Sequence, residues 1–211
     1  MKTIRKLLTF FSIAALIVSP TVFAGGSAKS EAPVIQTYDG AVVGTSKLVR
    51  TKHGITAQIR TTGLTPGHAM TMWIIFFNNP DACADPGNCN PDDDGANPAV
   101  GFDFHYAAGH VVNGSTTTLS GHLQAGETST SGGVEIGFPE AVPLLNPFGA
   151  QVWLAVHSHG PAQTGPTLAA QMSSFSGGCE TYLPFAGGVA GSPEEVADEV
   201  GECSTFQIAF H

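Results

Sequence analysis

The stretch that decides the fold is Ala69-Met-Thr-Met-Trp-Ile-Ile-Phe-Phe77, a run with apolar side chains on both of the faces that a strand presents. Because successive side chains of a strand point to opposite sides of its sheet, such a strand must be covered on both sides. The run is also far shorter than the roughly 20 residues that a membrane-spanning helix needs. The sequence therefore predicts a central strand that is buried on both faces.

Segments on either side of this run show the two-residue period of half-buried strands. In 100–106, the aromatic residues Phe102 and Phe104 fall on one face, and Asp103 and His105 fall on the other. Segment 150–157 alternates in the same way. Similar stretches, separated by turn residues, predict strands near 33–38, 41–51, 54–62, 69–78, 99–111, 115–124, 149–158, 167–175 and 204–210.

No long segment has a convincing helical period, and the strands recur at the short spacing of an all-β domain. We therefore expect one domain over residues 33–211, folded as a Greek-key antiparallel β-sandwich with two long loops. These loops run from Asn78 to Pro98 and from Gly177 to Glu202. Loops of this length in a compact domain carry function or need a clamp.

The first residues resemble a secretory signal. Basic Lys2, Arg5 and Lys6 precede an apolar run over 7–18, and small residues lead to Ala24. We expect a signal peptide over residues 1–24, cleaved after Ala24, and release of the chain to the periplasm or the medium. The alternative, an uncleaved membrane anchor, is disfavoured because the apolar run is short. The small polar residues 25–32 predict a flexible arm.

Four cysteines in an exported chain favour disulfides over free thiols. Three pairings are possible. We favour Cys83 with Cys89 and Cys179 with Cys203, because each pair closes a local loop rich in glycine, proline and acid. The competing interpretation is a thiolate metal site, but neither pair has the close spacing of a zinc knuckle.

The charges are unevenly distributed along the chain. Beyond the predicted signal there are five basic and seventeen acidic side chains, which gives a net charge of −12 with neutral histidines. No lysine or arginine follows Arg60, whereas fifteen acidic residues do. Such a surface repels nucleic acids and phosphorylated ligands, and it attracts cations. Solubility in a salty exterior explains the same composition, so a specific cation site is one of two interpretations.

Two histidine-containing pairs are candidates for a transition-metal site. His157 and His159 lie two residues apart on one face of a predicted strand, and Asp103 and His105 have the same spacing on another. If these strands were neighbours, the four side chains would form a nitrogen and oxygen site for copper or zinc. The alternative is that the histidines are structural and bind loop carbonyls.

Clustered carboxylates at Asp92, Asp93 and Asp94, followed by Gly95, are hard oxygen ligands that suit Ca²⁺. The segment lacks the downstream bidentate glutamate of an EF-hand, since Asp103 stands at the twelfth position. A solvated acidic turn is the competing interpretation.

Motifs of catalysis are hard to find in the sequence, although its many acidic residues leave a carboxylate pair of the glycosidase type open. There is no G-x-S-x-G elbow, no H-E-x-x-H motif and no phosphate-binding loop. The lack of lysine and arginine after Arg60 removes Schiff-base lysines and most carboxylate clamps from that stretch. Trp73 and Trp153 lie inside predicted strands, so we expect them in the core rather than as platforms for sugars.

Three segments carry a resemblance to known proteins: Gly63-Leu-Thr-Pro-Gly-His68, Trp73-Ile-Ile-Phe-Phe-Asn-Asn-Pro80 and 150–160, which ends in His157-Ser-His-Gly160. Through them the chain resembles a group of exported bacterial β-sandwich proteins without an assigned activity. More distantly, it is similar to the CHRD domain, whose sandwich is like that of copper/zinc superoxide dismutase. The resemblance implies a Greek-key sandwich. It does not imply dismutation, because the dismutase family has its H-x-H on an early strand and this chain has its only one late.

From the sequence we expect an exported, acidic binding module. Its ligand is a metal cation, bound as copper or zinc by histidines or as calcium by the acidic loop, or else a partner at the cell surface. One alternative is a metal-dependent enzyme that uses the same histidines. Another is a structural protein without a ligand.

Overall fold

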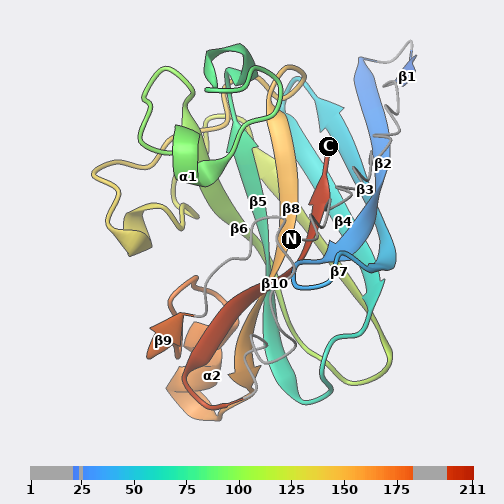
Figure 1. Cartoon of the computed structure of the whole chain (residues 1–211), viewed down its shortest axis with the longest axis vertical. Helices are drawn as coiled ribbons and strands as arrows, with labels where there is room; N and C mark the ends of the chain where they lie inside the picture. The colour runs from blue at the N-terminus through green and yellow to red at the C-terminus, as the bar shows by residue number, and fades with distance from the viewer. Residues whose placement is uncertain (1–20, 24–25, 183–198) are drawn as a thin grey trace, which may run out of the picture.

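A computed structural model describes residues 21–23, 26–182 and 199–211, and strands dominate these residues (Figure 1). The strands are β1 (Thr21–Phe23), β2 (Ser27–Gln36), β3 (Val42–Thr51), β4 (Gly54–Thr62), β5 (His68–Phe77), β6 (Phe102–Val111), β7 (Thr116–Gln124), β8 (Gln151–Pro161), β9 (Thr181–Tyr182) and β10 (Glu202–Phe210). Short helices lie between them: the 3₁₀ turns η1 (Pro80–Ala82) and η2 (Val134–Ile136), and the α-helices α1 (Pro91–Asp94) and α2 (Gly165–Gln171).

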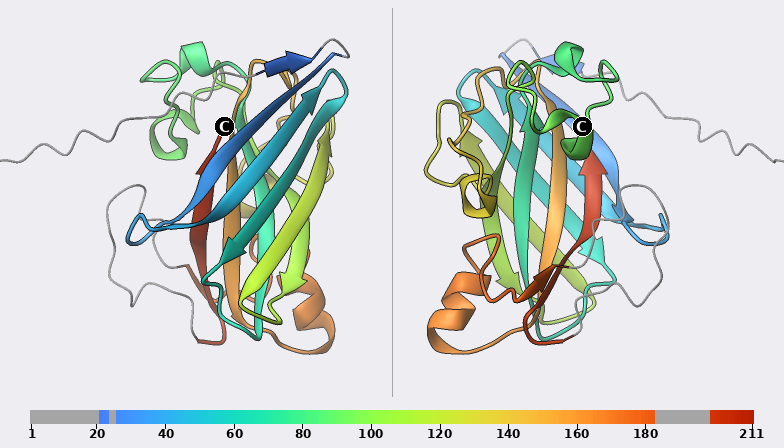
Figure 2. Two further views of the ribbon diagram at one scale, coloured as in Figure 1. Left: turned by 90° about the vertical axis from the view of Figure 1, so that its right-hand side faces the viewer. Right: turned by 60° about the vertical axis from the view of Figure 1, so that its left-hand side comes forward.

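Eight strands form one curved sheet in the order β6-β5-β8-β10-β2-β3-β4-β7, and all pairings along this path are antiparallel. The sheet folds over so that β2, β3, β4 and β7 cross in front of the other four strands (Figure 2). Buried aliphatic residues such as Leu48, Ile59, Ile74 and Leu154 fill the space between the two layers. The predicted antiparallel β-sandwich is confirmed.

Strand β10 joins the two layers, because it pairs with β8 on one side and with β2 on the other. The chain also returns β7 to lie beside β4 after the β5–β6 hairpin, which is the connection of a Greek key. Buried Arg50 secures this junction by donating hydrogen bonds to the carbonyls of Pro147 and Ala150, both at 2.8 Å. Its burial lowers the pKa of the guanidinium to about 10.

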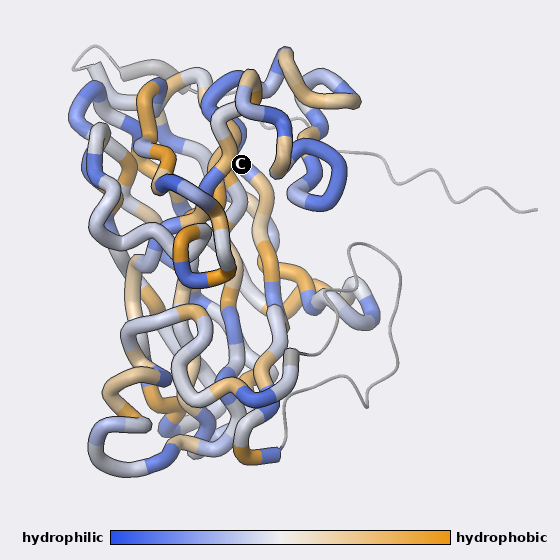
Figure 3. Tube along the Cα trace, turned by 90° about the vertical axis from the view of Figure 1, so that its left-hand side faces the viewer, coloured by the Kyte–Doolittle hydropathy of each residue, from blue (hydrophilic) through white to orange (hydrophobic). Residues whose placement is uncertain are grey.

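Central strand β5 is covered on both faces, as the sequence predicts. Met70, Met72, Ile74 and Phe76 face the space between the layers. The other face carries Trp73 and Phe77, which belong to a second, aromatic cluster outside the sandwich. The connection that contains α1 and the connection that contains η2 lie on this outer side (Figure 2). Hydrophobic residues occur along the strands and also in some of the connections (Figure 3).

Both predicted disulfides are confirmed: Cys83 is bonded to Cys89, and Cys179 to Cys203. The first closes the turn around η1, and the second joins the segment after α2 to the start of β10. Part of the second predicted loop, 183–198, lies outside the described residues, as does most of the predicted signal peptide. Among the described residues, no helix has the length and apolar character needed to cross a membrane.

Two elements differ from the sequence predictions. Residues 27–32 belong to β2 and pair with β3, so the predicted flexible arm is wrong apart from Gly25, which lies outside the described residues. Backbone hydrogen bonds to β3 hold this segment in place, and the pattern of its small side chains does not indicate that pairing. The strand predicted near 167–175 is also wrong, because 165–171 form α2. Pro166 in the first turn and the good helix formers that follow it explain the helix.

The sheet closes on itself where β7 approaches β6, and a glycine permits this approach. A Cβ atom on Gly121 would collide with the carbonyl oxygen and the side chain of Ala107 on β6. We expect Gly121→Ala to lower the free energy of unfolding by about 1–3 kcal/mol through overpacking, as measured by urea denaturation. Gly114→Ala is the matched control, because nothing lies near the added methyl group. Equal stability of the two variants would contradict this account of the closure.

His211 makes the junction of the two layers beside Arg50 sensitive to pH. Its ring nitrogens lie 2.8 Å from the hydroxyl groups of Ser30 and Ser46, and burial together with the charge of Arg50 lowers its pKa to about 4. Between pH 6.5 and 4 the unfolded chain therefore binds a proton at His211 that the folded chain does not bind. Stability is full above pH 6.5 and falls as the pH drops toward 4, by about 1.4 kcal/mol per pH unit for each such group.

We expect His211→Gln to flatten the dependence of the unfolding free energy on pH over this window, by about one proton. Denaturant titrations at several pH values between 4.5 and 7.5 measure the slope. His53, which is exposed on the turn after β3, supplies the control variant His53→Gln. The same slope in wild type and His211→Gln would refute the assignment.

Candidate functional site

An aromatic pocket of about 350 Å³ opens on the outer face of the β6-β5-β8-β10 layer. Six of its lining residues are aromatic, and both tryptophans of the chain are among them: Trp73, Phe102, Phe104, Phe138, Trp153 and Phe175. Its volume lies at the lower end of the range for small-molecule sites, which are mostly apolar with a few placed polar groups. We call this site the aromatic pocket.

Strand alternation builds the floor of the aromatic pocket. Odd-numbered residues of β5 and β8 and the even-numbered residues 102–106 of β6 face outward, which brings Ile75, Phe104 and Trp153 side by side in register. Trp73 packs edge-on against Phe104 and Phe175, with ring centroids 5.5 and 5.2 Å apart. Such contacts hold the rings in place, so the floor is preorganised.

Three connections supply the walls. Pro91 and Asp92 come from α1, Ile136 and Phe138 from the η2 segment, and Phe175 from the segment after α2. Ile136 is 47 % exposed, which is a high value for a large apolar side chain. The walls are therefore loop residues that meet over a rigid floor, an arrangement typical of binding sites.

Charge at the aromatic pocket is negative. Asp92 lines it, and the carboxylate of Glu135 on η2 accepts a hydrogen bond of 2.8 Å from the backbone N–H of Phe175. All lysines and arginines beyond residue 24 lie on the other layer or its turns: Lys29 on β2, Lys47 and Arg50 on β3, Lys52 just after β3, and Arg60 on β4. The two layers of the sandwich thus differ in charge.

One polar group in the pocket floor has no hydrogen bond within the described part of the chain. The indole N–H of Trp153 is buried and has no partner there. Leaving such a donor unsatisfied costs about 1–3 kcal/mol. The prediction that Trp153 lies in the core is confirmed, because it is buried in the outer aromatic cluster.

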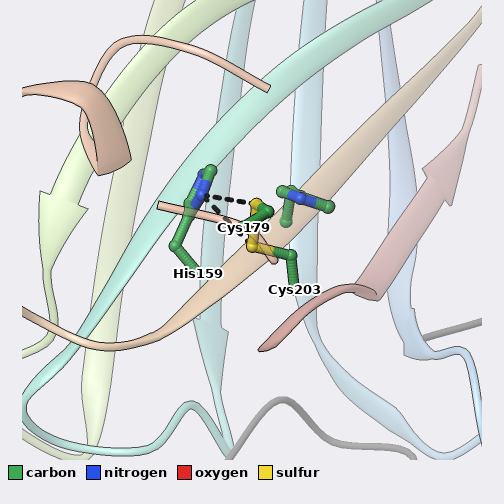
Figure 4. Close-up of side chains that lie close together, drawn as sticks. His159, Cys179 and Cys203 are labelled. Carbon is green, nitrogen blue, oxygen red and sulfur yellow. Dashed lines mark hydrogen bonds between the residues drawn. A yellow bond between two sulfur atoms is a disulfide. The ribbon is translucent and has the colours of Figure 1, made fainter. Parts of the chain in front are cut away.

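A second cluster lies beside the aromatic pocket, at the end of β8. His157 and His159 face outward there, and each offers a nitrogen within 4.8 Å of the sulfur atoms of Cys179 and Cys203. The His159 Nδ1 atom is 3.6 Å from one sulfur and 3.7 Å from the other (Figure 4). His157 stacks on Phe175, with ring centroids 4.3 Å apart, so the cluster and the pocket share a wall.

Hydrogen bonds determine the tautomer of His159. The indole of Trp73 can only donate, so Thr71 Oγ1 accepts from it at 2.8 Å and directs its own hydrogen to His159 Nε2, 2.9 Å away. At the other nitrogen, Nδ1–H donates to the carbonyl of Gly177 at 2.9 Å. His159 is therefore a neutral imidazole with its proton on Nδ1.

Burial keeps both imidazoles uncharged. Desolvation lowers the pKa of His159 to about 4, partly opposed by the hydrogen bond to Gly177. Desolvation and the neighbouring His159 lower the pKa of His157 well below its ordinary value. Neutral imidazole is the form that binds metals. The pair also behaves as the alternative interpretation of the histidines predicts, since His159 bonds a loop carbonyl.

The other predicted pair, Asp103 and His105, lies apart from this cluster. Strand β5 separates β6 from β8, so the two strands are not neighbours. The pairs also face opposite sides of the sheet, because His105 is in register with Ile74, an inward-facing residue of β5. A single copper or zinc site built from all four residues is therefore wrong. The two faces of β6 alternate as the sequence predicts, and its aromatic residues Phe102 and Phe104 face the outer cluster.

Asp103 and His105 anchor the connection that carries η2. The fully buried carboxylate of Asp103 accepts hydrogen bonds from Ser131 Oγ and from the backbone N–H groups of Phe104 and Val142. Burial raises the pKa of Asp103, but these bonds and one from His105 outweigh it, and the pKa lies below its ordinary value. His105 Nε2 donates to the carbonyl of Val142 at 3.1 Å.

The predicted calcium ligands are split between two environments. Asp94 is buried, and its carboxylate accepts hydrogen bonds of 2.7 Å from the backbone N–H groups of Ala84 and Asn90. Asp94 thus braces the loop that the first disulfide closes. Asp92 and Asp93 are exposed, and only Asp92 lines the aromatic pocket. Calcium binding at Asp92–Asp94 stays a prediction.

Sequence reasoning missed the aromatic pocket. Its residues come from seven separate segments, and the tryptophans, which are buried as the sequence predicts, also line it. The sequence did hold a signal for it. A strand that is apolar on both faces needs a second apolar layer. In addition, Phe102 and Phe104 alternate with Asp103 and His105, so one face of that strand has to take up buried polar groups. That pattern indicates a second core outside the sandwich.

Loss of the Asp103 carboxylate should loosen the η2 connection. We expect Asp103→Ala to lower the free energy of unfolding by about 2–4 kcal/mol, because buried donors lose their acceptor. Glu127→Ala is the control: its exposed carboxylate also accepts hydrogen bonds from two backbone N–H groups, so a much smaller loss is expected. Chemical denaturation compares the two, and similar losses would contradict an anchoring role.

No family model matches this chain, and neither the curated proteins nor the solved structures include a match. The similarity to the CHRD domain and to the superoxide dismutase sandwich stays a prediction.

Proposed function

We propose that this protein is an exported binding module that holds a small organic cation with an apolar body, such as a quaternary ammonium compound, in the aromatic pocket. The observation that carries the proposal is the lining of the pocket: six aromatic side chains with the carboxylate of Asp92 beside them. Export rests on the predicted signal peptide. Two disulfides among the described residues are compatible with an oxidising compartment.

The chemistry of the lining selects among ligand classes. Aromatic faces attract cations electrostatically, by about 0.5–2 kcal/mol for each contact, and more strongly where water is displaced. An anion would meet Asp92 and no basic group, since all lysines and arginines of the described residues are on the other layer. A neutral apolar molecule gains from burial alone. A cation with an apolar body gains from the aromatic faces, from the carboxylate of Asp92 and from burial of its apolar part.

Three probes of similar size and different charge test the proposal: benzyltrimethylammonium, benzyl alcohol and benzoate. Both tryptophans line the pocket, so quenching of their fluorescence reports occupancy, and calorimetry supplies Kd. We expect Kd for the cation to be at least about tenfold lower than for the neutral probe, which corresponds to about 1.4 kcal/mol, and no binding of benzoate. Equal binding of the neutral probe, or tighter binding of the anion, would overturn the proposal.

Neighbouring acids supply a matched pair of variants. Asp92→Asn should weaken binding of the cation by about two- to fivefold, as expected for a partly exposed charge, and leave the neutral probe unaffected. Asp93→Asn removes an equal charge one residue away, outside the pocket lining, and should have a smaller effect. If the two variants weaken binding equally, only the net charge of the surface is responsible.

Metal binding at His157 and His159 is a second candidate function. It is favoured by the four potential ligand atoms that lie within 4.8 Å of one another. While the disulfide is intact, the two imidazoles are the only donors of this group for copper or zinc, because bonded sulfurs do not act as thiolates. A partner at the cell surface stays a prediction.

A further inference from the structure

His157, His159, Cys179 and Cys203 have the side chains of a tetrahedral metal site. The disulfide between the two cysteines prevents their sulfur atoms from binding a metal as thiolates. His157, His159 and Cys203 are almost fully buried, and Cys179 is partly exposed. Two imidazole nitrogens and two sulfur atoms are a ligand set typical of structural zinc. In the described structure the two sulfurs are bonded to each other. The disulfide therefore decides whether the set is complete.

The spacing of the cluster agrees with zinc coordination. With Zn–S of about 2.3 Å and Zn–N of about 2.0 Å, a tetrahedral site places sulfur and nitrogen about 3.5 Å apart. His159 Nδ1 already lies 3.6 Å from Cys179 Sγ and 3.7 Å from Cys203 Sγ (Figure 4). The sulfurs themselves have to separate from bonding distance to about 3.8 Å. Cleavage of the disulfide allows this separation.

We propose that reduction of the Cys179–Cys203 disulfide converts this cluster into a site that binds one Zn²⁺ ion through His157, His159 and both cysteines. The proposal deepens the second candidate function and does not depend on the aromatic pocket. It assigns the site a metal, a full ligand set and a redox condition.

The chemistry balances with a dithiol as reductant. The dithiol passes two electrons and two protons to the S–S bond and becomes a disulfide, and Cys179 and Cys203 become thiols. Partly exposed Cys179 is the sulfur that an attacking thiolate reaches. Zn²⁺ then displaces the two thiol protons, so two thiolates and two neutral imidazoles surround the ion with no net charge.

Surrounding hydrogen bonds accommodate the change at His159. Coordination through Nδ1 breaks the bond to the carbonyl of Gly177 and moves the imidazole proton to Nε2. Thr71 Oγ1 has a second lone pair beside the one that accepts from Trp73, so it can accept from Nε2. A partner of this kind orients a metal-binding histidine.

The second disulfide is an internal control. Cys83 and Cys89 also lie close to a carboxylate, that of Asp94, but this group is occupied by two backbone N–H groups. No imidazole completes that cluster among the described residues. Reduction of Cys83–Cys89 should therefore create no comparable site.

The experiment titrates oxidised and phosphine-reduced protein with Zn²⁺ against a chromophoric chelator, and with Co²⁺ as a spectroscopic probe. We expect one equivalent of zinc in the reduced protein, bound at least about 100-fold more tightly than in the oxidised protein. Co²⁺ should show the intense visible bands of a tetrahedral site and a thiolate charge-transfer band. Equal zinc affinity in both redox states leaves metal binding by the histidines standing and overturns the redox condition.

Paired cysteine variants locate the site. Cys83→Ser/Cys89→Ser should keep the zinc equivalent after reduction, and Cys179→Ser/Cys203→Ser should lose it together with the thiolate band. His157→Gln and His159→Gln should each weaken zinc binding by at least about tenfold. If reduction unfolds the protein, near-UV circular dichroism must recover when zinc is added. Lack of that recovery, or zinc retained by Cys179→Ser/Cys203→Ser, overturns the proposal.

Discussion

Burial of both faces of β5 is the constraint on which the rest of the structure depends. The inward face is covered by the opposite layer of the sandwich, as in any two-layer domain. The outward face carries Trp73 and Phe77, and it requires a cover that the eight-stranded sheet does not provide. The connections with α1 and η2 and the segment after α2 supply this cover. The aromatic pocket lies where these three covers meet, so the candidate site follows from the way the central strand is buried.

Much of the fold could be predicted from local patterns, and the site could not. Alternation identified most strands, and loop composition identified both disulfides, because these signals lie within a few residues. Strand order is different: nothing near Asp103 or His157 indicates that β5 separates their strands. The alternation of β6 also identified its two faces, but it did not show which of them lies toward the main core. That choice depends on loops distant in sequence, which give Asp103 its hydrogen-bond donors and cover Phe102 and Phe104.

Acidic side chains act mainly as supports for the connections around the aromatic pocket. Asp94 braces the loop around the first disulfide, Asp103 holds the connection with η2, and Glu135 holds the segment that contains Phe175. Each carboxylate accepts from backbone N–H groups of a connection, which lets segments without regular structure keep one conformation. Acidic residues thus shape the walls of the pocket as well as its charge. The acidic side chains therefore have two physical roles: they stabilise the connections, and they influence which ligand the pocket binds.

The position of β10 has a consequence for the way the chain folds. This strand, formed by the last described residues, lies between β8 and β2 and is the only strand that joins the two layers through backbone hydrogen bonds along the main path of the sheet. The meander of β2, β3 and β4 can pair as soon as it is made, but its backbone hydrogen bonds to the other layer wait for β10, about 170 residues after β2. Closing so long a loop costs entropy before it is rewarded by contacts. Assembly of the sandwich is therefore a late and slow event, and an incomplete chain exposes the edges of both half-sheets.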